Sequence, residues 1–184
     1  MRRILAELPE TLDATYERIL QEIPKSNQVH AHRLLQCLTV AVRPLLVKEL
    51  AEILAVDFST SEGIPKLNKA LRWEDQEQAV LSACSSLIAV IEDEDEDSRV
   101  VQFSHFSVKE FLTSDRLATS RMDASRYHHI PLEHAHTIMA QACLGVLLQL
   151  NHIDEASIQD FPLAWYASNH FGDHAEFEGV LSHV

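Results

Sequence analysis

The chain has eleven histidines, and a histidine side chain can act as a general acid, a general base or a metal ligand. Eight of them fall in four close pairs that suggest metal ligands: His30 with His32, His128 with His129, His134 with His136, and His170 with His174. The last pair has the i, i+4 spacing of a zinc-binding HExxH helix. It lacks the glutamate that would act as the base, and Gly172 between the two weakens a helix. We therefore expect surface and half-buried histidines and no metal site.

The other candidate nucleophiles are Cys37, Cys84 and Cys143, an odd number without a CxxC spacing. Each lies in an apolar helical pattern, where a free cysteine behaves as a small hydrophobic residue with an unreactive thiol. A disulfide framework is not expected, which favours an intracellular, cytoplasmic protein. The sequence has neither a GxSxG nor a Walker A motif. We expect no catalytic residues and no enzyme, and a histidine-based hydrolase is the weakest alternative.

The charge of the chain argues against two classes of partner. Fifteen Lys and Arg residues face 28 Asp and Glu residues, for a net charge of −13. Nucleic-acid binding depends on cations that neutralise phosphates, and an anionic membrane surface repels an acidic protein. The most apolar stretch, Ala142–Leu150, is too short to span a bilayer. We expect no nucleic-acid and no membrane partner.

The hydrophobic periodicity predicts a mainly α protein. The expected helices are Leu8–Ile23, Gln28–Val42, Leu45–Val56, Glu74–Ser86, one starting at Ser107, Pro131–Leu150 and Pro162–Phe171. We expect a loop over 57–67 and a polar connector over Ser114–Arg126. Two short apolar runs, Leu87–Ile91 and Val100–Phe103, flank six adjacent carboxylates and predict one antiparallel hairpin.

This order predicts a winged helix-turn-helix with one short two-stranded antiparallel wing, followed by a helical subdomain. We divide the chain into an N-terminal helical segment (1–44), a winged-helix core (45–118) and a C-terminal helical subdomain (119–184). The candidate DNA-recognition helix, Glu74–Ser86, has no Lys or Arg, which again disfavours DNA binding. A third paired strand is not expected.

The helix after the hairpin has local signals for its start. Ser107 and Glu110 fit the S-x-x-E capping box, in which each side chain binds a free amide. Phe106 and Phe111 then fall at the two positions of a hydrophobic staple. We expect the helix to begin at Ser107.

Several stretches together resemble a known family. They are LPETLD (8–13), AVRPL (41–45), KELAE (48–52), VQFSHFSVKEFL (101–112), Ala135-His136 with Ala142–Leu144, and PLAWYASNHFGDH (162–174). They resemble the segment that follows the NACHT ATPase in fungal NLR-like STAND proteins. The core of that segment is described as a GPI inositol-deacylase-type winged helix, and ankyrin or other repeats commonly follow it. One departure is Leu46, where similar proteins often have Thr or Ser as a helix cap.

The resemblance implies a non-catalytic regulatory module that holds a nucleotide-bound resting state. It implies that ADP or ATP is bound by an adjacent NACHT domain absent from this chain, which itself has no cofactor. The implied partners are that domain and the downstream repeats of the same polypeptide, or other proteins. In the proteins that the chain resembles, a histidine in the motif H-x-S-F/V-x-E-F/Y reaches the nucleotide phosphates. The resemblance implies this role for His105, and the neighbouring motif residues are Phe106, Ser107, Glu110 and Phe111. The free amides of the helix start would also favour an anion. A stand-alone helical protein-binding scaffold is the alternative.

Overall fold

The computed structural model describes residues 12–60, 64–84, 86–92, 99–120, 123–150 and 155–180. The start of the first expected helix and most of the acidic hairpin tip lie outside these residues. The described part is mainly helical, as expected. Its α-helices are α1 (Leu12–Glu22), α2 (Gln28–Val40), α3 (Val47–Leu54), α4 (Gln76–Cys84), α5 (Phe106–Leu112), α6 (Asp115–Ala118), α7 (Asp123–Tyr127), α8 (Leu132–Leu150) and α9 (Ala164–Ala175). Short 3-10 helices cover Lys69–Leu71 and Glu155–Asp160.

The stretch expected as a polar connector contains the two short helices α6 and α7. The Ser114 hydroxyl starts α6, because it accepts a hydrogen bond from the Leu117 amide at 3.3 Å. This cap was present in the sequence, but the segment has too few apolar residues for a periodic pattern.

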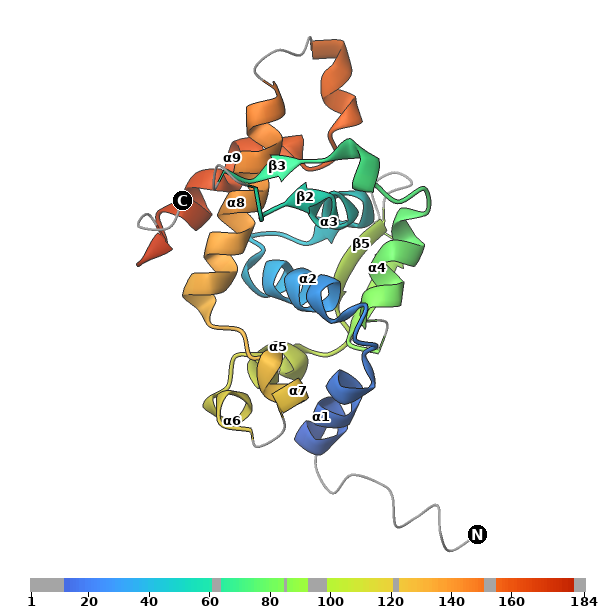
Figure 1. Ribbon diagram of the computed structural model, residues 1–184, viewed down its shortest axis with the longest axis vertical. Coiled ribbons are helices and arrows are strands. Elements are labelled where there is room, and N and C mark those ends of the chain that lie inside the picture. The colour runs from blue at the N-terminus through green and yellow to red at the C-terminus, as the bar shows by residue number, and fades with distance from the viewer. Residues whose placement is uncertain are drawn as a thin grey trace, which may run out of the picture.

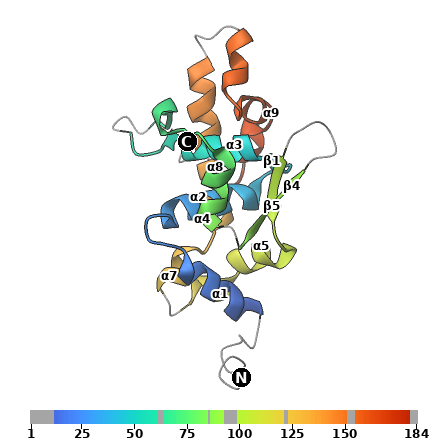
Figure 2. The same ribbon diagram turned by 90° about the vertical axis from the view of Figure 1, so that its right-hand side faces the viewer.

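The expected wing is confirmed as β4 (Ile88–Glu92) antiparallel to β5 (Arg99–Phe103). The expectation of only two strands is wrong, since β1 (Leu45–Leu46) pairs with the other side of β5 and gives the order β1-β5-β4. The sequence α2, β1, α3, α4, β4, β5 is the element order of a winged helix with its first strand included. Figure 2 shows this sheet at one side of the molecule, with α5 below it.

A second correction concerns the expected loop over 57–67. Its two ends form a small antiparallel pair, β2 (Val56–Asp57) with β3 (Lys66–Leu67). Val56 and Leu67 are buried, and the pair lies on α8 (Figure 1). Gly145 of α8 permits this approach, because a Cβ there would lie 3.2 Å from Val56 Cγ1. Strands of two residues are too short to show the alternation that predicts a strand.

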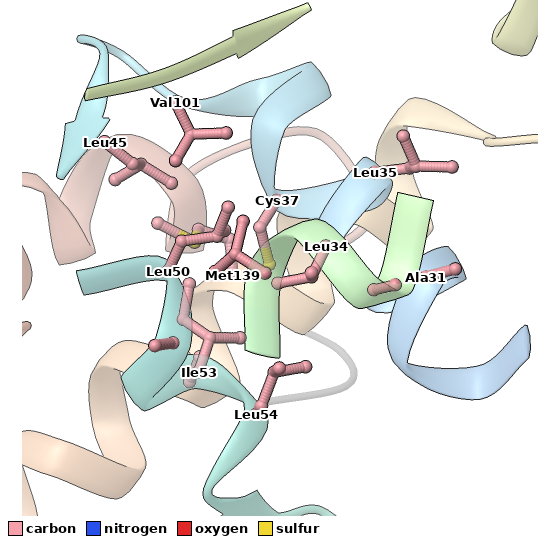
Figure 3. Close-up of a cluster of buried hydrophobic side chains, with 14 of the residues drawn as sticks. Ala31, Leu34, Leu35, Cys37, Leu45, Leu50, Ile53, Leu54, Val101 and Met139 are labelled. Carbon is pink, nitrogen blue, oxygen red and sulfur yellow. The ribbon is translucent and has the colours of Figure 1, made fainter. Parts of the chain in front are cut away.

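The core is built around α2, which lies between α3, α4 and α8 (Figure 1). Figure 3 shows the centre, where Leu34 and Cys37 of α2 meet Leu50 of α3, Val101 of β5 and Met139 of α8. Helix α8 packs against both α2 and α9. The division into three segments at residues 44 and 118 stays a prediction.

Candidate functional site

His105 lies between β5 and α5, where the backbone is still extended. Its ring is exposed, and it is the residue that caps α5. The Nδ1 atom accepts a hydrogen bond from the Ser107 amide at 3.3 Å and lies 2.6 Å from the Ser107 hydroxyl. The first turn of α5 therefore restrains the imidazole.

These contacts define the tautomer of His105. Because the Ser107 amide donates to Nδ1, the neutral ring carries its proton on Nε2. Among the described residues, Nε2 has no hydrogen-bond partner. An exposed imidazole with an unused N–H can donate to an oxyanion, such as a phosphate oxygen, at this position.

Ser107 also connects α5 to the first helix. Its hydroxyl lies 2.8 Å from the Tyr16 hydroxyl of α1, 91 residues away in the sequence. The Tyr16 ring packs against Phe111, with ring centroids 5.5 Å apart. Tyr16 was not predicted as part of the site, and its distance in the sequence gives no local signal.

The structure corrects the expected start of α5. The helix begins at Phe106 and is capped by His105, so Ser107 lies in its first turn and does not form a capping box with the exposed Glu110. The staple is also absent, because Phe106 is 71% exposed and Phe111 is buried. Phe106 instead lies beside the His105 ring, with centroids 4.3 Å apart.

Two of the amides at the start of α5, which were expected to be available for an anion, are engaged. The Ser107 amide binds His105 Nδ1, and the Val108 amide binds the His105 carbonyl at 3.0 Å. These two amides are therefore not available to an anion, whereas the Nε2 atom of His105 is.

The other histidines that the structure describes do not converge on His105 or on one another in a metal-like cluster. Within the described ranges, no group of three or more His, Cys, Asp or Glu side chains is placed to hold a metal ion. His170 pairs with Asp173 at 2.9 Å, and the rings of His32 and His128 are 5.7 Å apart. His170 and His174 thus have different hydrogen-bond partners despite their spacing.

His174 belongs to a buried hydrogen-bond network that the sequence did not indicate. Its Nε2 lies 2.9 Å from the Tyr166 hydroxyl, which accepts from the Val42 amide at 3.1 Å. Its Nδ1 lies 3.0 Å from His136 Nδ1. Burial, followed by the neighbouring His136, lowers the pKa of His174 to about 4. The network holds α9 against α8 and the end of α2.

The cysteines match the expectation of buried, unpaired thiols. Burial raises the pKa of Cys37 and of Cys84 to about 12 and also raises the pKa of Cys143. A thiol with a raised pKa is a poor nucleophile.

Helix α8 is the longest of the described helices. Neither it nor any other helix in the described part of the chain has the length and apolar character needed to cross a bilayer.

Comparison with known proteins agrees with this architecture. Residues 16–122 match the family described as "GPI inositol-deacylase, winged helix domain". The chain is 33% identical over 176 residues to azaphilone pigments biosynthesis cluster protein L of Monascus ruber, an alignment that covers 92% of this chain. The chain spans 36% of the length of that relative. No solved structure matches the chain.

The matched residues begin within α1 and extend through α6, so they include α2 to α6 and the three-stranded sheet, whereas α7, α8 and α9 lie beyond them. His105, Ser107 and Tyr16 all lie within them. The match therefore includes the complete strand–helix junction that restrains His105. The chain belongs to the family of GPI inositol-deacylase-type winged helix domains.

Proposed function

We propose that this chain is a non-catalytic regulatory module of a NACHT-type STAND ATPase. In this proposal, an adjacent domain binds ADP, and His105 donates a hydrogen bond to a phosphate oxygen in the resting state. The module thereby favours the closed conformation until the nucleotide is exchanged. An intracellular location is part of the proposal and fits the unpaired cysteines.

The observation that carries the proposal is the geometry of His105. A restrained, exposed imidazole with its proton on Nε2 is suited to contacting an anion on another domain. The start of α5 offers little of a phosphate cradle, since the amides of Ser107 and Val108 are already hydrogen-bonded. A contact from His105 alone would thus act as a sensor for a nucleotide held elsewhere.

Two features support a non-catalytic role. The described histidines are distributed over separate groups, and the described residues contain no metal-like cluster. Ser107 and His105 are close enough for a nucleophile and a base, at 2.6 Å. However, among the described residues no carboxylate orients the imidazole through Nε2, as a catalytic triad requires.

The first test is the effect of His105→Ala on ADP release from the full-length protein. A hydrogen bond to a charged group contributes about 1.5–3 kcal/mol, so we expect ADP release to become roughly ten- to a hundredfold faster. His134→Ala is the matched control, because His134 is also exposed but lies on α8. ADP release is measured by displacement of a fluorescent ADP analogue.

Equal ADP release from His105→Ala and the wild type would contradict the sensor role. The sequence encoded before Met1 provides an independent test, since the proposal requires a Walker A motif there. If that motif is missing, the stand-alone protein-binding scaffold becomes the better proposal.

A further inference from the structure

An open groove of about 620 Å³ lies at the free edge of the three-stranded sheet, where α9 begins. Figure 2 shows α9 beside the end of the sheet that carries β1. Four separate parts of the chain form the groove: the turn after α2, the β1–α3 junction, β5 and the start of α9. Its lining residues are Arg43, Pro44, Leu46, Lys48, Glu49, Val100, Pro162 and Trp165.

One partly buried ion pair, between Arg43 and Glu49, holds the residues that form this groove in place. The Arg43 guanidinium donates to both carboxylate oxygens of Glu49, at 2.9 and 2.6 Å. It also lies 5.1 Å from the Trp165 ring centroid and 4.9 Å from that of Tyr166. Bidentate pairing and ring stacking both fix a guanidinium in position. The groove is therefore already formed in the free protein.

The surface of the groove is apolar, with one uncompensated cation. Trp165 is 64% exposed, and Pro44, Leu46, Val100 and Pro162 lie around it. Because Glu49 neutralises Arg43, the remaining charge belongs to Lys48, which is exposed and has no ion pair among the described residues. Lys48 therefore adds a positive charge to an apolar groove that also contains the exposed indole of Trp165.

The groove favours recognition through side chains. The Leu46 amide of the edge strand β1 is already bound to Glu49 at 2.8 Å, so it is not available to an added strand. Exposed tryptophans at the centre of an apolar patch are frequent anchors of protein interfaces. A carboxylate is the group that Lys48 would select.

We propose that this groove binds an extended, acidic segment of a partner protein. An apolar side chain of that segment packs on Trp165 between Pro44 and Pro162, and a neighbouring carboxylate pairs with Lys48. This proposal goes beyond the regulatory function proposed above, because it requires neither ADP nor His105.

The experiment uses the terminally blocked peptide EELPLEE, in which proline keeps the chain extended and leucines provide the apolar contact. The comparison peptide is KKLPLKK, which has the same apolar residues and the opposite charge. The chain has two tryptophans, so a Trp73→Phe background leaves Trp165 as the fluorescent reporter. We expect EELPLEE to shift the Trp165 emission to shorter wavelength in a saturable manner, with binding that weakens as salt is added.

Lys48→Glu should weaken binding of EELPLEE about fivefold or more and should bring KKLPLKK to a higher affinity than EELPLEE. Lys25→Glu is the matched control: it makes the same charge change at an exposed turn between α1 and α2 and should leave binding unchanged. Loss of both peptides on Lys48→Glu, or an equal effect of Lys25→Glu, would overturn the proposal. So would the absence of any emission shift with EELPLEE. Analytical ultracentrifugation without peptide tests for self-association. If the chain dimerises as its concentration rises, with the same shift of the Trp165 emission, a second copy of the chain occupies the groove and the proposal is overturned.

Discussion

Glu49 and Glu52 on α3 show how single buried carboxylates connect the winged helix to the rest of the chain. Both side chains are almost completely buried. Glu49 pairs with Arg43, whereas Glu52 pairs with Arg72 and accepts a hydrogen bond from the Leu163 amide at 2.7 Å. Burial raises the pKa of Glu52, while the hydrogen bond from Leu163 and the charge of Arg72 oppose that rise. The paired ion thus joins α3 to the segment that begins α9.

Replacing Glu52 should lower the free energy of unfolding, because its hydrogen-bond partners would be left without an acceptor. Glu52→Ala leaves the buried Leu163 amide without an acceptor and Arg72 without its carboxylate. Breaking a buried pair costs about 3–5 kcal/mol, and we expect roughly 2–3 kcal/mol here because Arg72 is partly exposed. Urea unfolding gives the free energy, with the exposed Glu110→Ala as a control that should change it by less than about 0.5 kcal/mol. A loss below 1 kcal/mol would show that Glu52 is not an anchor.

At the scale of elements, the helices and strands that could be predicted are those whose apolar pattern extends over several consecutive residues. The hairpin of β4 and β5 was predicted because two apolar runs flank a charged segment. The strand β1 was missed because Leu45 and Leu46 also fit the helical stripe of α3. Their pairing with Val101 and Val100 depends on residues more than 50 positions away, which periodicity does not detect.

The start of α5, within the candidate site, was also predicted wrongly because contacts with residues far away in the sequence decide it. Ser107 and Glu110 have the spacing of a capping box, but the Ser107 hydroxyl is engaged by Tyr16 and His105. His105 itself was predicted from the family motif, not from its own spacing. Tyr16, which completes the site, has no partner within its own part of the sequence.

The contact between α1 and α5 leads to a prediction about their coupling. The Tyr16 and Ser107 hydroxyls share one partly buried hydrogen bond, so either Tyr16→Phe or Ser107→Ala alone should remove it. We expect each variant to lose about 1 kcal/mol of unfolding free energy. The double variant should lose less than the sum, with a coupling of roughly 0.5–1.5 kcal/mol. Chemical denaturation of the four proteins measures this cycle, and strictly additive losses would exclude the coupling.

At the scale of the molecule, buried and half-buried histidines in the described part of the chain have lowered pKa values and stay neutral at neutral pH. Burial, together with the nearby His128, lowers the pKa of His32 to about 3, and burial lowers that of His128 to about 4. His128 is completely buried, and neither of its ring nitrogens has a hydrogen-bond partner among the described residues. These two rings pack where α2 meets the segment between α7 and α8. Protonation of either His32 or His128 is therefore unfavourable in the folded protein.

This unfavourable protonation predicts that stability falls as the solution is acidified. Below the ordinary histidine pKa of about 6.5, the unfolded chain binds protons that the folded chain excludes. The unfolding free energy should thus be highest near neutral pH and decline from pH 6.5 towards 5, where most carboxylates are still ionised. Each excluded proton contributes a slope of up to about 1.4 kcal/mol per pH unit. His128→Leu removes one of these groups and should reduce the slope by up to that amount, while the exposed His134→Leu, which removes only a smaller charge effect on His32, should change it much less. Thermal and urea unfolding at a series of pH values gives both slopes. If His128→Leu follows the same pH dependence as the wild type, the burial of His128 is not a source of acid sensitivity.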